Sequence, residues 1–211
     1  MKKILLTILM GAVILPAFGQ YNTQRERSRY SHRGTEQYFG VRLGLNLACI
    51  NSDDVNMDMD SRSGLAVGGV YGLLLTNSTP LWMEIGALYS EKGGQMHING
   101  YDVKTRLSYL QAPIVIKYSF DVYDDLYLQP YLGGYLAMGI GGKTKNYGTR
   151  ESYSSYDKLN RFDGGLRVGC GVEYQMIYAE LGFDFGLANV SKDDFNTARN
   201  QSFFINVGVN F

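Results

Sequence analysis

Residues 37–48 read QYFGVRLGLNLA, with a large apolar side chain at every second position from Phe39 to Leu47. The positions between them hold small or polar residues, among them Arg42 and Asn46. Successive side chains of a β-strand point to opposite faces. This alternation therefore predicts one long strand with an apolar face and a contrasting face.

The same period of two continues to the end of the chain and predicts an all-β fold. Pro113 interrupts the pattern in one segment, which predicts a bulge there because proline cannot donate a backbone hydrogen bond. The total of about eight strands is the smallest even number found in transmembrane β-barrels. The other predicted strands cover residues 63–76, 81–90, 105–118, 126–140, 162–174, 177–187 and 203–211.

The connections between these strands alternate in length. Strict alternation is expected when consecutive strands run up and down and every second connection faces the same side. Outer-membrane barrels combine short periplasmic turns with long extracellular loops. We therefore predict an eight-stranded antiparallel up-and-down transmembrane β-barrel over residues 37–211, with both of its ends in the periplasm. The long connections are 51–62, 92–104, 141–160 and 188–201, and the short ones are 77–80, 119–125 and 175–176.

The contrasting face distinguishes a membrane barrel from a soluble barrel of the lipocalin kind. It is poor in Lys, rich in Gly and carries charges of both signs, which suits the narrow interior of an eight-stranded barrel. We interpret the charges as a paired plug, and the alternative is a polar track for ions or small solutes. The predicted interior cluster is Arg42, Glu84, Arg167, Glu173, Glu180 and Asp184.

Aromatic residues gather beside the predicted short turns. Amphipathic rings favour the level of the lipid headgroups, so the grouping predicts an aromatic girdle on the outer face. The residues assigned to it are Trp82, Tyr118, Tyr127, Tyr174 and Phe211, with Phe120, Tyr123 and Tyr178 nearby.

The first residues have the order of a secretory signal peptide. Two lysines precede an apolar run over residues 4–15, which is too short to span a bilayer, and small residues follow it. We expect residues 1–19 to be removed by cleavage between Gly19 and Gln20. The polar residues 20–36 show no apolar period and predict a flexible periplasmic leader.

Composition excludes several functions and favours few sites. The formal net charge is zero, so no strongly basic face is expected to bind nucleic acid. We expect no disulfide between Cys49 and Cys170, because their strands are distant in the barrel order. The acidic residues of two long loops lack the spacing of a calcium-binding loop, and no metal or cofactor is expected. These acids are Asp53, Asp54, Asp58 and Asp60 in one loop, and Asp193 and Asp194 in the other.

Three segments carry a resemblance to a known family. Residues 107–113 (LSYLQAP), 129–134 (QPYLGG) and 164–174 (GGLRVGCGVEY) resemble the porin-family, PorT-type outer-membrane β-barrel proteins. The apolar last strand ending in Phe211 resembles the signal read by the barrel-insertion machinery. The resemblance covers about residues 37–211 and implies an outer-membrane location in a Gram-negative bacterium. One branch of the family takes part in type IX protein secretion, and no residue assigns this chain to that branch.

The sequence favours a non-enzymatic structural or interaction platform in contact with outer-membrane lipid and with protein partners. A narrow porin-like channel is the first alternative. Further alternatives are a component of protein secretion and a lipid-modifying membrane enzyme, for which His97 is the candidate histidine without a recognisable partner serine.

Overall fold

The computed structural model covers the chain, which divides into the units Met1–Gly34 and Thr35–Phe211. The predicted signal peptide, residues 20–35 of the predicted leader, and the acidic residues 53, 54, 58, 193 and 194 lie outside the described part. The described residues are 36–52, 60–76, 79–98, 101–123, 125–146, 152–155, 160–190 and 198–211.

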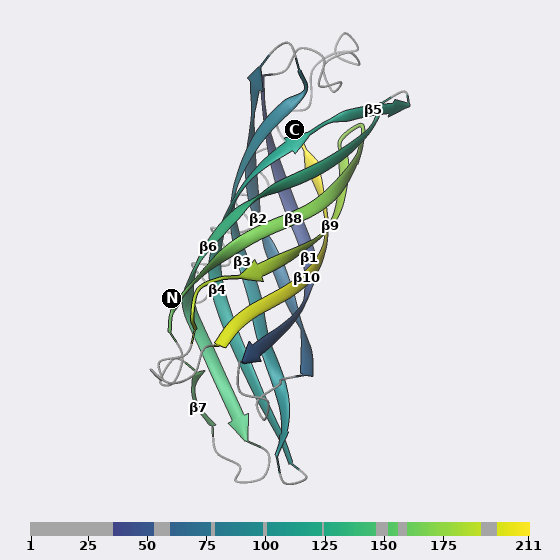
Figure 1. The fold of residues 1–211 in the computed structure, drawn as a ribbon. Coiled ribbons are helices and arrows are strands. Elements are labelled where there is room, and N and C mark those ends of the chain that lie inside the picture. The colour runs from purple at the N-terminus through teal and green to yellow at the C-terminus, as the bar shows by residue number, and fades with distance from the viewer. Residues whose placement is uncertain are drawn as a thin grey trace, which may run out of the picture. The chain divides into compact units, whose positions relative to one another are not determined.

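The described residues form one antiparallel sheet that closes into a barrel (Figure 1). Eight long strands follow one another around the ring in the order β1, β2, β3, β4, β6, β8, β9, β10. The short strands β5 and β7 pair with β6 at its ends. No helix in the described part of the chain is long and apolar enough to cross a membrane. The strands are β1 (Gln37–Ser52), β2 (Asp60–Thr76), β3 (Leu81–Ile98), β4 (Tyr101–Tyr118), β5 (Phe120–Tyr123), β6 (Leu126–Asn146), β7 (Ser152–Ser154), β8 (Phe162–Tyr174), β9 (Ile177–Gly186) and β10 (Ala198–Asn210).

The first and last strands close the ring. β1 pairs with β2 on one side and with β10 on the other, so that Val41 lies opposite both Gly69 and Val209. The eight-stranded antiparallel barrel predicted from the alternation is confirmed. The start of β1, the end of β10, the strand β5 and the described turn residues 79–80 and 175–176 all lie at one end, here called the short-turn end. The opposite end is the long-loop end.

The distribution of apolar and polar side chains between the outer face and the interior is the reverse of that in a soluble barrel. The large apolar residues of the alternating pattern are exposed on the outer face, for example Leu45 at 60% and Leu132 at 62%. The interior instead holds polar and charged side chains such as Asn46 and Gln129 at 4% and 2%. An exterior of this kind is stable when it faces lipid, because the hydrocarbon then replaces water around the apolar side chains.

The strands are longer than the sequence predicts at the long-loop end. The predicted loop 92–104 is wrong, because β3 and β4 pair as far as Ile98 and Tyr101. β6 likewise runs to Asn146, into the predicted loop 141–160. Alternation marks a strand only where one face is apolar, and these extensions lie beyond the apolar part of the outer face.

Pro113 does not cause the predicted bulge. The register of β3 with β4 is the same on both sides of it, with Ile85 opposite Ile114 and Leu88 opposite Gln111. The irregularity in β4 lies instead between Ser108 and Tyr109, in its pairing with β6. A proline within a strand can thus be accommodated by leaving out one hydrogen bond, without a shift of register.

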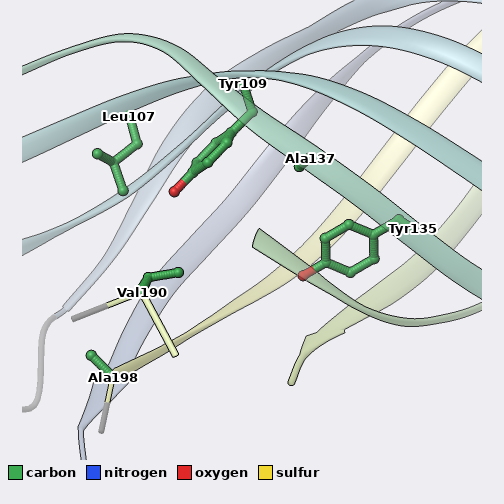
Figure 2. Packing of buried hydrophobic residues seen from close by; sticks show 6 residues of the cluster. All are labelled: Leu107, Tyr109, Tyr135, Ala137, Val190 and Ala198. Atoms are coloured by element: carbon green, nitrogen blue, oxygen red, sulfur yellow. The ribbon is translucent and has the colours of Figure 1, made fainter. Parts of the chain in front are cut away.

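Apolar side chains fill the long-loop end of the interior (Figure 2). The segment after β9 folds inward there, and Val190 and the first residue of β10, Ala198, are joined by a backbone hydrogen bond of 2.9 Å. Figure 2 shows the ring of Tyr109 pointing toward Val190, which has no exposed surface. The residues of this group are Leu107, Tyr109, Tyr135, Ala137, Val190 and Ala198.

Candidate functional site in the barrel interior

The structure places all six side chains of the predicted polar cluster inside the barrel. None of them is more than 9% exposed. Their positions follow from the strand period, because each lies in phase with other inward residues of its own strand. They lie at two levels of the interior and belong to two ionic groups, and Arg167 interacts electrostatically both with Asp184 of its own group and with Glu180 of the other. The six residues are Arg42, Glu84, Arg167, Glu173, Glu180 and Asp184.

The ionic group nearer the short-turn end is centred on Glu84. Its Oε2 accepts hydrogen bonds from the hydroxyl of Tyr38 at 2.5 Å, from Lys117 Nζ at 2.8 Å and from Arg42 Nη2 at 3.3 Å. Lys117 also donates to the hydroxyl of Tyr178 at 2.7 Å. Four strands or strand ends therefore meet at one buried carboxylate and its donors.

Two further carboxylates complete this half of the interior. Glu180 accepts hydrogen bonds from Asn206 at 2.7 Å and from Tyr178 at 3.2 Å. Glu173 lies close to the short-turn end and accepts from Asn210 at 2.7 Å and from Gln129 at 3.2 Å. Buried charges are tolerated when their hydrogen bonds are satisfied, and these side chains supply the required donors.

The second ionic group lies nearer the long-loop end and is centred on Lys92. Its Nζ is 3.6 Å from Asp163 Oδ2 and 3.5 Å from Asp184 Oδ2. Arg167 approaches Asp184 from the other side, with Nε 3.6 Å from Oδ1. Gln111 donates to Asp184 at 2.8 Å. The side chains again come from several strands, so the group ties opposite walls of the barrel together.

An apolar row of side chains lies between the two ionic groups. Tyr131 is opposite Gly169, Gly169 is opposite Gly182, and Gly182 is opposite Phe204 in the register of four neighbouring strands. A Cβ built on Gly182 would lie 2.5 Å from Phe204 Cζ. The glycines therefore leave the space that the two rings occupy. With Val115, the rings of Tyr131 and Phe204 form one buried cluster, here called the Phe204 row.

Cations also lie against aromatic faces in this interior. The guanidinium carbon of Arg167 is 3.9 Å from the centre of the Phe204 ring, and that of Arg42 is 4.0 Å from the centre of the Tyr178 ring. Lys92 lies 4.1 Å from the centre of the Tyr135 ring. Such contacts strengthen when water is excluded, which is the case for these buried side chains.

Of the five residues predicted for the aromatic girdle, the structure places three on the outer face and two on the inner face. Tyr118, Tyr174 and Phe211 are exposed on the outer face at 37%, 50% and 42%. Trp82 is instead 2% exposed and packs inside against Tyr38, with ring centres 5.4 Å apart. Position 82 is in phase with Glu84, so the alternation already directs it inward.

Tyr127 and Tyr178 also belong to the inner face. Tyr127 lies directly opposite Glu173 in the register of β6 with β8, and residues opposite one another share a face. Tyr178 has no exposed surface and lies within the first ionic group. Grouping aromatics by closeness to a turn therefore fails where the strand phase points inward.

Among the described residues, three buried charged side chains of the interior were missing from the predicted cluster. Lys92 fell in a predicted loop, and Lys117 lay in a strand whose phase Pro113 obscured. Asp163 was on the contrasting face of its strand but was not included. Because the register of β4 continues unchanged across Pro113, the strand phase assigns Lys117 to the interior. Among the described residues, no group of His, Cys, Asp and Glu is arranged to hold a metal ion.

The profile of one protein family matches residues 18–192 of the chain, and the family is described as outer membrane protein beta-barrel domain. The chain belongs to this family. Membership places the protein in the outer membrane, which agrees with its apolar outer face. The resemblance to PorT-type proteins is a narrower assignment than this family match gives.

Solved structures of outer-membrane proteins are similar to this outer-membrane barrel. Neisserial surface protein A is 17% identical with a TM-score of 0.49, and the match covers 82% of this chain and 97% of that one. Ail of Yersinia pestis is 14% identical with a TM-score of 0.44, covering 84% and 100%. No curated protein sequence matches the chain. The family match, not these likenesses, carries the assignment.

Proposed function

We propose that this outer-membrane barrel is a closed, non-enzymatic platform that holds its long loops at the cell surface. The supporting observation is the burial of the charged interior. Arg42, Lys92 and Lys117 are 2%, 2% and 1% exposed, although an aqueous lumen would leave the side chains that line it in contact with water. Eight strands enclose an interior that side chains can just fill.

The order of layers along the interior supports the same proposal. The Phe204 row lies between the levels of Glu180 and Asp184, and the apolar group around Val190 lies at the long-loop end. Each cation of the ionic groups has a carboxylate or an aromatic ring as its neighbour. An ion crossing the barrel would have to displace these contacts, each of which holds two or more strands together.

A narrow channel is the second candidate, and the charges on both sides of the Phe204 row favour it. Such a channel would require the rings of Tyr131 and Phe204 to move. Thiol accessibility separates the two candidates. The inward Ser202, 1% exposed, and the neighbouring outward Gln201 form a matched pair for substitution by Cys, with Cys49 and Cys170 replaced by Ser.

We expect Ser202→Cys in the folded barrel to resist a small water-soluble methanethiosulfonate reagent and to react fully only after unfolding. Gln201→Cys in detergent serves as the accessible control. Rapid labelling of Ser202→Cys in the folded protein would contradict the closed platform and support the channel.

The proposal includes the route to the membrane and the orientation in it. Export uses a signal peptide cleaved near Gly19, and the last strand directs insertion. The termini lie in the periplasm with the short-turn end, because outer-membrane barrels have short periplasmic turns and long extracellular loops. Deletion of Phe211 should reduce insertion into the outer membrane. Protease added to intact cells should cut in the long loops and leave the short turns intact.

Partners are proposed to be outer-membrane lipid and surface or secretion proteins that contact the loops. Crosslinking in cells, followed by identification of the linked proteins, tests this part. A secretion component among them would support the secretion branch of the family. Catalysis on lipid is tested separately, because a lipid A mass shift that disappears on His97→Ala would overturn the non-enzymatic proposal.

A further inference from the structure

Four cations are arranged as a two-by-two array on the outer face of β4 and β6. Lys104 lies directly opposite Lys145, and Arg106 lies directly opposite Lys143. Lys143 and Lys145 are exposed, and the side chain of Arg106 is 51% exposed. These four residues are here called the basic quartet.

Cations directly opposite each other on neighbouring strands repel and are destabilising. Glu91 of β3 forms a salt bridge with Arg106. The two lysines of β6 have no carboxylate in the positions opposite them, because their partners on the other side are Ser154 and Ser152 of β7. The arrangement therefore favours an anion that approaches from outside the barrel.

The height of Arg106 and Lys143, the pair of the basic quartet nearer the apolar surface, is close to that of the lipid headgroups. The last outward apolar residues before it are Leu110 on β4 and Ile140 on β6, which are 53% and 55% exposed. Arg106 and Lys143 follow them by three or four residues. At about 3.3 Å per residue and a tilt of roughly 45°, this is about 7–9 Å beyond the apolar surface. Headgroups occupy the layer of roughly 5–8 Å outside the hydrocarbon.

The outer face of the same strands also offers a hollow for an acyl chain. A shallow apolar pocket of about 380 Å³ lies between β4, β6 and β8, nearer the middle of the barrel. Ile114, Leu136 and Phe162 are among the residues that line it. The phosphorylated headgroup of a lipid could therefore contact the basic quartet while its acyl chains contact the apolar pocket nearer the middle of the barrel.

We propose that the basic quartet binds phosphate groups of the outer-leaflet glycolipid. The proposal rests on the orientation given above, in which the long-loop end faces outward. Arg and Lys donate charge-assisted hydrogen bonds to phosphate oxygens, and these are stronger than neutral ones. The bound phosphate would neutralise the repulsion between the paired cations and fix the barrel against its surrounding lipid.

Binding of bisphosphorylated lipid A to the folded protein in detergent, followed by native mass spectrometry, tests the proposal. Dephosphorylated lipid A with the same acyl chains is the matched ligand. The matched variants are Lys143→Gln and Arg199→Gln, since Arg199 is an exposed cation on β10 whose register partner Asn51 is neutral. Each variant removes one charge and should keep heat-modifiable migration on gels.

We expect lipid A binding to weaken about tenfold in Lys143→Gln and further in Lys143→Gln/Lys145→Gln, since a hydrogen bond to a charged group contributes about this factor. Arg199→Gln should stay within about twofold. Equal binding by both single variants, or by dephosphorylated lipid A, would overturn the proposal. So would displacement of the lipid by equimolar inorganic phosphate, or tighter binding of phosphatidylglycerol. None of these results bears on whether the barrel is closed, which thiol accessibility measures separately.

Discussion

Lys117 and Glu84 meet inside the barrel, with Nζ 2.8 Å from Oε2, although they belong to the opposed strands β4 and β3. They are offset in register, so the pair is diagonal. The same carboxylate also accepts from Arg42 of β1 and from Tyr38. Because one oxygen accepts from three donors, the carboxylate should contribute more to the free energy of unfolding than a single ion pair does.

Glu84→Gln should lower the free energy of unfolding by about 3–5 kcal/mol, because Lys117 and Arg42 would stay buried beside a neutral amide. Urea unfolding of the refolded barrel in lipid vesicles, followed by tryptophan fluorescence, measures it. Asp121→Asn, at an exposed position of β5, is the control and should change stability by less than about 0.5 kcal/mol.

Removing the cation together with the carboxylate supplies a second check. Glu84→Gln/Lys117→Met should be less destabilised than the sum of its two single variants, since the uncompensated ammonium is then gone. Strict additivity of the two substitutions would show that this pair does not act as a unit.

Gly182→Ala should destabilise the barrel by about 1–3 kcal/mol through overpacking of the Phe204 row. Its new methyl group would lie 2.5 Å from Phe204 Cζ and 2.7 Å from the carbonyl oxygen of Val168, and a backbone atom cannot move aside easily. Gly141→Ala is the matched control, because nothing lies within 4 Å of a Cβ at that position. Similar unfolding curves for both variants would mean that the interior is loosely packed.

Gln175→Gly should stabilise the hairpin between β8 and β9 by roughly 0.5–1 kcal/mol. Gln175 has φ 55°, a left-handed conformation that costs an ordinary L-residue about 1 kcal/mol and costs glycine little. Met176→Gly, at the other turn position, lacks this relief and should be neutral or destabilising. A loss of stability in Gln175→Gly would show that the side chain has a stabilising role of its own.

Cys49 and Cys170 should both remain thiols in the exported protein. Both side chains are thiols in the structure and lie on β1 and β8, with β9 and β10 between them in the ring. Intact mass in denaturant should therefore be unchanged by reduction, and an alkylating reagent should add to two thiols. A gain of two hydrogen atoms on reduction would reveal a bond that this barrel order does not allow.

The fold was predictable because the barrel repeats one simple pattern. Each ring strand exposes an apolar residue at every second position, as Leu43 and Leu45 do in β1. This pattern ends where the outer face leaves the lipid, which is why the hairpin of Ile98 and Tyr101 was mistaken for a loop. Strand pairing beyond the membrane depends on backbone hydrogen bonds, and these leave little trace in side-chain polarity.

The inward orientation of the charged residues was predictable from phase, and their partners were not. Phase assigns Glu84 to the interior, but its contact with Lys117 depends on the diagonal offset between strands. The separation of the interior by Tyr131 and Phe204 depends on glycines placed opposite these rings. Such complementarity appears only when the register of neighbouring strands is known.

Planar-bilayer conductance of the folded wild-type protein is the most direct test of the closed barrel. A porin reconstituted in the same way shows that the assay detects an open lumen. The account predicts no steady single-channel openings above the lipid baseline, because the two ionic groups and the Phe204 row fill the interior. Steady openings in the wild type that are lost on Glu84→Gln or Arg167→Met would contradict it.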